Sequence, residues 1–277
     1  MTEKTTRNKG VSINDTDSFK NLSIQVSLNG LSFFVLDSIT QKVDAFEQIN
    51  FKVDTTPYLL QKELKKLLEK NNLDKALFEK VQVVHNNDMF CLVPKPLFDV
   101  NELPNYLKFN TKLLANDEIA YDELSHHEIT SVYVPFTNIN NLIFELYGEF
   151  EFIHNSSMVL QSLFNHKIGS KPVCYAHISK TNFELIAFDK KKLLLFNQFQ
   201  YKTKEDFLYY LLFTYEQLGF DTESVKVKLF GSIEEGDELF NICYQYIKKV
   251  AVFEPNTKEI ESNPKDSIDL THLNTFK

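Results

Sequence analysis

Histidine side chains are the first candidates for chemistry, because they bind metals and transfer protons near neutral pH. His126 and His127 are adjacent in the stretch SHHEIT. A zinc-protease helix of the HExxH type needs two histidines four residues apart, and Ser131 stands where the second would be. We therefore expect this pair to lie in a solvated loop. His85 and His154 each end a predicted strand beside an asparagine, which favours capping or turn roles.

The acidic stretch ANDEIAYDELSHHE is a second candidate, since paired carboxylates can hold a metal or act as acid and base. Its carboxylates are Asp117, Glu118, Asp122, Glu123 and Glu128. A run this acidic is usually a solvated surface loop. We expect a loop here, with no metal ligand and no catalytic residue.

Cysteine spacing indicates neither a metal site nor a disulfide. Cys91, Cys174 and Cys243 are far apart, each inside an apolar segment, and no CxxC pair is present. Isolated apolar cysteines are typical of buried free thiols in a reducing cytoplasm.

The phosphate-binding motifs GxxxxGK[ST] and GxGxxG are absent, and so is the serine nucleophile motif GxSxG. Seven glycines leave the chain little means of cradling a phosphate. The 38 acidic and 30 basic side chains give a net charge of -8, which repels nucleic-acid backbones. We expect no nucleic-acid partner and no cofactor, and composition disfavours an enzyme acting on nucleotides.

The two ends of the chain differ from its middle. Residues 1–20 and 257–277 are polar and almost free of aromatic side chains, so we expect mobile tails. The first residues lack the apolar core of a signal peptide, and no apolar run reaches the roughly 18 residues that span a bilayer. A cytoplasmic protein without membrane insertion is the expectation.

The first half of the chain predicts a strand meander followed by alternating helices and strands. Asn29 and Gly30 are expected to supply positive φ angles at the first hairpin. Thr56 and Pro57 predict a helix start, and leucines at helical spacing follow them. The predicted strands are 22–28, 31–38, 43–51, 80–86, 89–95, 129–136 and 149–155, and the predicted helices are 57–70, 100–109, 138–148 and 156–166.

The second half repeats this order after the stretch KIGSKP. Three strands are predicted within 173–199, then a helix, a strand at 224–232, a helix within 236–249 and a strand at 250–255. Thr203 and Asp206 form a capping pair, and Gly219 ends the first of these helices. The duplication predicts two domains, 21–170 and 171–256.

The helix that begins after Thr203 reads DFLYYLLFTYEQLGF and is apolar nearly all round. A helix that is apolar on both sides is expected to be buried on both. Two explanations remain open: burial between a sheet and a neighbouring domain, or a subunit interface, where Tyr and Phe are enriched.

Three meander strands followed by alternating helices and strands, present twice, resemble the actin, Hsp70 and sugar-kinase superfamily. More narrowly, the chain resembles an uncharacterised family of Bacteroidota proteins (DUF3822), and its second half is similar to the actin-like protein of type IV pilus assembly. The resemblance covers residues 21–256. It implies an α/β fold of duplicated ribonuclease-H-like (actin-like ATPase) domains, each a mixed sheet with a three-strand meander flanked by helices.

The resemblance also implies where an ATP site would lie. Members of the superfamily place an Asp on the first strand of each half and a glycine-containing turn after it, and the acid orients hydrated magnesium. In this sequence Gln25 and Ser27 take those positions in LSIQVSLNG, and His177 and Ser179 take them in VCYAHISKTN. Both acids are therefore missing.

A third element of the resemblance is a Gly-Gly turn that accepts the adenosine. The stretch VKLFGSIEEGDELF keeps Gly231 and Ser232 in that place, although any connection from a strand to a helix can use such a turn.

Asp37 is the remaining acid near the first turn. It lies at the far end of the second strand, seven residues from Gly30. At about 3.3 Å per residue, this separation is roughly 20 Å, too far to share a magnesium site with the turn.

Together the residues favour a two-domain actin-like protein that has lost ATP hydrolysis, is not an enzyme, and binds an unidentified protein partner or a second copy of itself. A degenerate nucleotide-binding protein or kinase, with the turn from Gly231 to Gly236 holding adenosine, is the alternative. A third hypothesis is an interaction module whose halves simply pack together.

Overall fold

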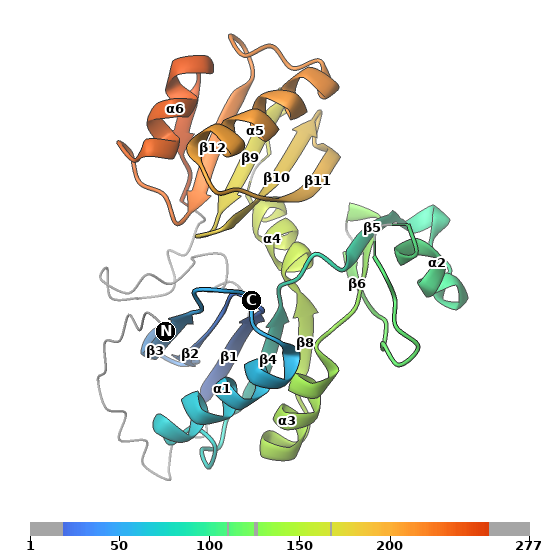
Figure 1. Ribbon diagram of the computed structural model, residues 1–277, viewed down its shortest axis with the longest axis vertical. Helices are drawn as coiled ribbons and strands as arrows, with labels where there is room; N and C mark the ends of the chain where they lie inside the picture. The colour runs from blue at the N-terminus through green and yellow to red at the C-terminus, as the bar shows by residue number, and fades with distance from the viewer. Residues whose placement is uncertain (1–18, 110, 125–126, 167, 255–277) are drawn as a thin grey trace. The chain divides into compact units, whose positions relative to one another are not determined.

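The computed structural model describes residues 19–109, 111–124, 127–166 and 168–254 (Figure 1). Contacts divide these residues into two compact units, unit 1 up to Gln161 and unit 2 from Ser162. The tails expected at 1–20 and 257–277 lie outside the described residues, apart from Phe19 and Lys20, and so does His126.

Unit 1 is built on a five-stranded mixed sheet in the order β3-β2-β1-β4-β8. The first three strands form an antiparallel meander, and β4 and β8 extend the sheet in parallel with β1. The strands are β1 (Lys20–Ser27), β2 (Gly30–Asp37), β3 (Lys42–Asn50), β4 (Lys80–His85) and β8 (Glu151–His154).

Helices α1 (Pro57–Lys70) and α3 (Thr137–Tyr147) cover one face of this sheet (Figure 1). The predicted start of α1 is confirmed, because the Thr56 side chain accepts a hydrogen bond from the Leu59 amide and Pro57 follows it. The core under the helices contains alternate residues of β1, whose other residues face the opposite side of the sheet. These core residues include Leu22, Ile24 and Val26 from β1 and Leu60, Leu64, Leu67 and Leu68 from α1.

A smaller three-stranded antiparallel sheet, in the order β5-β7-β6, lies between β4 and α3 in the chain. It contains β5 (Phe90–Pro94), β6 (Ala120–Leu124) and β7 (Ile129–Tyr133), with short 3-10 turns at Lys95–Leu97 and Val100–Glu102 and helix α2 (Leu103–Leu107). Strand β6 falls inside the acidic stretch, so the loop expected there is wrong for Ala120–Leu124, whereas Asp117, Glu118 and Glu128 lie outside the strands. Its alternate residues point inward and form part of a packed sheet.

Unit 2 repeats the layout of unit 1, with the sheet order β11-β10-β9-β12-β13. The meander is again antiparallel, and β12 and β13 again add in parallel. The expected duplication is therefore confirmed. The strands are β9 (Val173–Ile178), β10 (Asn182–Asp189), β11 (Lys192–Gln200), β12 (Lys226–Gly231) and β13 (Val250–Val252).

Helices α5 (Lys204–Leu218) and α6 (Glu238–Tyr246) cover one face of the unit 2 sheet, as Figure 1 shows. The division between the units falls within helix α4 (Asn155–Phe164). The capping box of Thr203 and Asp206 is present, and Gly219 ends α5 with a left-handed φ of 65°. Among the described residues, we find no helix that is both long enough and apolar enough to cross a bilayer.

Within unit 2, helix α5 is buried on one side. Phe207, Leu211 and Tyr215 are buried against the sheet, whereas Tyr209 is 61% exposed and Phe213 is 45% exposed. Both explanations for the apolar outer side, a neighbouring domain and a subunit interface, stay predictions.

Candidate functional site

Gln25 occupies the place of the first missing acid and is held within its own sheet. The side chain is buried, its Nε2 donates to Ser23 Oγ at 2.6 Å, and its Oε1 accepts from Ser32 Oγ at 2.7 Å. Ser32 lies directly across from Gln25 in the β1–β2 pair. The amide is therefore neutral, internally bonded and unable to supply a carboxylate to a metal.

The turn after β1 is closed by its own side chains. Ser27 Oγ donates to Asn29 Oδ1 at 2.5 Å and lies 2.9 Å from the Gly30 carbonyl oxygen. Neither Asn29 nor Gly30 has a positive φ, so that expectation is wrong. Gly30 is required instead by a close approach, because a Cβ there would lie 2.8 Å from the Ile49 carbonyl oxygen of β3.

Asp37 is confirmed to lie at the opposite end of β1 from this turn, since it pairs with Lys20 whereas Gly30 pairs with Ser27. Its Oδ1 accepts hydrogen bonds from the amides of Thr40 and Ile39, at 2.7 and 3.0 Å. These bonds, that of Thr40 above all, lower the pKa of the carboxyl group. Asp37 therefore stabilises the β2–β3 turn.

His177 occupies the place of the second missing acid and pairs with a carboxylate that the sequence interpretation missed. His177 Nδ1 lies 2.5 Å from Glu184 Oε2, and both side chains are buried. The two residues are direct neighbours across the β9–β10 pair, and the imidazole stacks on Phe230 with the ring centroids 4.7 Å apart. The register of the β9–β10 pair, which the sequence does not show, places Glu184 opposite His177.

The Gly231–Ser232 turn is bonded to the end of β9. Gly231 has a φ of 89°, and a Cβ there would overlap the Ile178 carbonyl oxygen and lie 2.9 Å from His177 Cδ2. The Ser232 amide donates to the same Ile178 oxygen at 2.7 Å. The glycine is thus explained by packing within unit 2, and the Ser232 amide is already paired. Ser179 is also engaged, because its amide donates to the Asn182 carbonyl oxygen at 2.9 Å.

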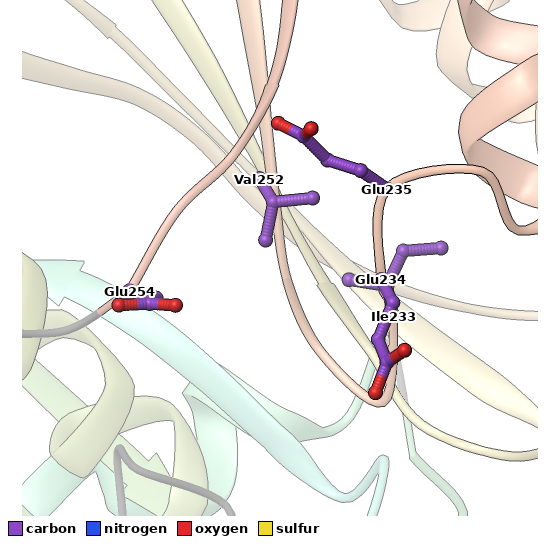
Figure 2. Close-up of a pocket in the computed structure, with 5 residues that line it drawn as sticks. All are labelled: Ile233, Glu234, Glu235, Val252 and Glu254. Carbon is purple, nitrogen blue, oxygen red and sulfur yellow. The ribbon is translucent and has the colours of Figure 1, made fainter.

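An open depression of about 600 Å³ follows this turn and is acidic (Figure 2). Its lining residues are Ile233, Glu234, Glu235, Val252 and Glu254. Figure 2 shows the three carboxylates turned in different directions, so they do not converge on one point. Within the described ranges, no group of three or more His, Cys, Asp or Glu residues is placed to hold a metal ion. A surface of this charge repels phosphate groups.

A buried polar cluster lies elsewhere, where β6 and β7 meet the end of β8. Asp122 accepts hydrogen bonds from the Tyr133 hydroxyl at 2.9 Å and from the His154 amide at 2.8 Å. The solvated position expected for Asp122 is therefore wrong, and burial raises the pKa of its carboxyl group to about 6. Because Tyr133, Asp122 and His154 come from three strands, their hydrogen bonds join the small sheet to the main sheet of unit 1.

The imidazole of His154 is fully engaged at the start of α4. Its Nδ1 accepts from the Ser156 amide at 3.1 Å, which leaves Nε2 as the protonated nitrogen, 3.2 Å from the Asn87 carbonyl oxygen. Burial is the main cause that lowers the pKa of His154 to about 3. A neutral imidazole whose two nitrogens are both occupied has a structural role.

His85 has the corresponding role before α3. Its Nδ1 accepts from the Phe136 amide at 3.2 Å, and its Nε2 lies 2.9 Å from Asn140 Oδ1. Burial lowers the pKa of His85 to about 4, so this imidazole is neutral as well. Each imidazole thus accepts from a backbone amide where a strand end meets a helix start, and these are structural roles of the capping or turn kind that was expected.

The remaining candidates show no catalytic geometry. His127 is exposed, in agreement with the loop expected for it. Cys174 and Cys243 are buried free thiols, as expected, and burial raises the pKa of each to about 12. Cys91 is free and half-buried, and burial raises its pKa too. Thiols that stay protonated at neutral pH are poor nucleophiles.

Solved structures share this fold. A Bacteroides thetaiotaomicron protein with an actin-like ATPase fold and unknown function aligns with a TM-score of 0.77 and 21% identity, over 90% of this chain and 97% of that chain. The PilM–PilN type IV pilus biogenesis complex aligns with a TM-score of 0.53 and 12% identity, over 91% and 92%. The ethanolamine utilization protein EutJ from Carboxydothermus hydrogenoformans aligns at 0.50 and 9%, over 94% and 91%. The chain therefore has the actin-like ATPase fold that the resemblance implied.

Sequence comparison gives the family. No curated protein matches the chain. A family profile described as Protein of unknown function (DUF3822) matches residues 11–250, which is most of the chain. The chain therefore belongs to this family, Protein of unknown function (DUF3822).

Proposed function

We propose that the protein is a non-catalytic, actin-like scaffold that has lost ATP hydrolysis and acts by binding another protein. One observation carries the proposal: the side chains in place of both acids, Gln25 and His177, are buried and hydrogen-bonded within their own sheets. Each therefore stabilises the sheet on which a catalytic acid would stand.

The chemistry of phosphoryl transfer explains why this matters. Transfer from ATP requires magnesium to neutralise charge on the phosphates, and carboxylates are the protein ligands that recruit it. Gln25 carries no charge. Glu184 is the acid nearest to the second position, but its Oε2 is directed at His177. Two acidic side chains, those of Glu234 and Glu235, follow Gly231 in the chain and further disfavour a triphosphate.

A protein partner is supported by analogy. PilM, whose complex with PilN shares this fold at a TM-score of 0.53, assembles with another protein. We extend this kind of role to the present chain, with an unidentified protein or a second copy as the partner. A cytoplasmic location, without nucleic-acid binding or membrane insertion, completes the proposal.

The second candidate, a degenerate nucleotide binder or kinase, would place the uncharged adenosine in the depression beside the Gly231–Ser232 turn, although the acids there repel the phosphates. Thermal melting distinguishes the two functions, because a ligand that binds only the folded state raises the melting temperature. The scaffold proposal predicts the same melting temperature with and without ATP and magnesium. A rise that is abolished by Glu235→Trp, which fills the depression, would support the second candidate instead.

A further inference from the structure

Lysines gather at one end of the unit 2 sheet, around the turn between β10 and β11. Strand β10 ends at Asp189 and β11 begins at Lys192, so the turn itself consists of Lys190 and Lys191. Strands β9 and β12 begin at the same end of the sheet, because β9 runs antiparallel to β10 and parallel to β12. The exposed lysines around the turn, which we call the basic end, are Lys171, Lys190, Lys191, Lys192 and Lys226.

The turn holds two consecutive residues in a left-handed conformation, with a φ of 49° at Lys190 and 67° at Lys191. Asn-Gly is the pair that suits a two-residue hairpin turn of this kind, because longer side chains are strained at a positive φ. In the described ranges, no other two consecutive residues share this conformation. The corresponding turn of unit 1, residues 38–41, has one positive φ and no charged side chain. Strain at two charged residues indicates a role beyond the turn itself.

The charge of the basic end is not cancelled within the chain. None of its five lysines forms an ion pair with another residue that the structure describes. Asp189 is the acid beside the turn. In the loop before β12, Glu223 pairs with Lys248, and Asp221 accepts a hydrogen bond from the Glu223 amide. The basic end therefore attracts anionic groups, although the chain as a whole has a net charge of -8.

We propose that the basic end docks an acidic segment of a partner protein. An extended polyanion, such as a membrane surface or a nucleic acid, would also meet the acidic remainder of the chain, whereas a short acidic segment contacts the basic end alone. Lysine ammonium groups are point charges on separate flexible stems, which suits carboxylates spaced along a peptide. This inference rests on the protein-binding function proposed above and gives it a surface and a partner chemistry.

The variant Lys190→Asn/Lys191→Gly separates docking from the stability of the turn. It removes two charges and introduces the residues that the turn conformation favours, so we expect a higher urea midpoint than for the wild type. Affinity for an acidic peptide should fall by about tenfold or more. Lys190→Gln/Lys191→Gln, which keeps the strained conformation, should weaken binding to the same extent with an unchanged urea midpoint.

Lys202→Gln/Lys204→Gln is the matched control. It removes two exposed lysines at the start of α5, which follows the far end of β11 from the turn. Because the change in net charge is the same as for Lys190→Gln/Lys191→Gln, a difference in affinity between the two variants reports the location of the lysines. We expect the control to bind the acidic peptide as the wild type does.

Fluorescence anisotropy of a labelled polyglutamate peptide, titrated with the full chain at two salt concentrations, provides the measurement. We expect saturable, salt-sensitive binding by the wild type and the control, and weaker binding by both turn variants. Phosphatidylserine vesicles and duplex DNA, tested in the same way, should bind more weakly than the peptide.

Three results would overturn the proposal: a wild type that does not bind the peptide, turn variants that bind it as the wild type does, or a preference for vesicles or DNA. Each would remove this surface and leave the loss of ATP hydrolysis untouched. Magnesium-dependent turnover of ATP would instead contradict the proposed function and leave the basic end as a docking site.

Discussion

His177 Nδ1 and Glu184 Oε2 lie 2.5 Å apart across the β9–β10 pair, in the interior of unit 2. The superfamily resemblance implies an aspartate at position 177, where it would orient magnesium. Here the position holds a hydrogen-bonded side chain, and the carboxylate next to it is directed at the imidazole. Gln25, bonded to Ser23 and Ser32, shows the same replacement in unit 1. In both units, therefore, the side chain at the position where the resemblance implies an acid is bonded within its own sheet.

Loss of the Glu184 carboxylate should destabilise unit 2. Removal of one partner of a buried polar pair costs more than the pair itself contributes, because the other partner stays buried without its acceptor. We expect Glu184→Ala to lower the free energy of unfolding by about 3 kcal/mol, as measured by urea denaturation. Glu184→Gln, which keeps an acceptor oxygen, should lower it less.

Glu223 provides the matched control, because its ion pair with Lys248 is exposed at 66–68% for the two side chains. Glu223→Ala should leave the urea midpoint nearly unchanged, since exposed ion pairs contribute little. Equal effects of Glu184→Ala and Glu223→Ala would contradict a structural role for the His177–Glu184 pair.

The stability of unit 1 should fall in acid. His85 and His154 have pKa values of about 4 and about 3 in the folded protein against 6.5 unfolded, so the unfolded chain binds more protons below pH 6.5. Each histidine therefore lowers the free energy of unfolding by about 1.4 kcal/mol per pH unit as the pH falls below 6.5. Asp122 acts in the opposite direction between about pH 6 and 3.8, because its folded pKa is raised. In that window, the two histidines and Asp122 together lower the free energy of unfolding by about 1.4 kcal/mol for each pH unit that the pH falls.

The variant Asp122→Asn isolates the opposing contribution. Between about pH 6 and 4, the free energy of unfolding of this variant should fall with pH about twice as steeply as the three-group slope of the wild type. Asp88→Asn, at an exposed position, should keep the slope of the wild type. Urea midpoints measured at several pH values give both slopes. Identical slopes for the wild type and Asp122→Asn would contradict a raised pKa of Asp122 in the folded protein.

The packing role of Gly231 can be separated from its backbone conformation. Gly231 and Gly236 both have a positive φ, of 89° and 97°, but only at Gly231 would a Cβ meet other atoms within 4 Å. Both Gly231→Ala and Gly236→Ala destabilise the folded state, because alanine is strained at a positive φ. Gly231→Ala also forces the turn away from Ile178 and His177. We expect Gly231→Ala to cost about 1–2 kcal/mol more in urea denaturation. Equal costs would mean that the turn can move freely.

Much of the fold was predictable because local signals and packing agree. Thr56 and Pro57 begin α1, Thr203 and Asp206 begin α5, and Gly219 ends it, as the capping patterns predicted. Strand β6 was not predictable, because Asp122 is an acid whose burial depends on Tyr133 and on the His154 amide, and these partners are distant in sequence. The exposure of Tyr209 and Phe213 was missed because apolar composition does not show which side of a helix is covered.

The candidate site was predictable in part. The absence of acids at Gln25 and His177 follows from the resemblance and the sequence alone. What occupies those places does not, because Ser32 and Glu184 approach them only through the register of the meander strands. The conformation of the first turn was missed for a similar reason: Gly30 is selected by the Ile49 carbonyl oxygen of β3, which a single hairpin does not reveal.

Calorimetric titration of the full chain with ATP and magnesium tests the central claim most directly. Because Gln25 and His177 are bonded within their sheets and present no carboxylate, we expect no saturable heat of binding and no phosphate release. Micromolar binding together with magnesium-dependent turnover would contradict the claim that this actin-like protein has lost ATP hydrolysis.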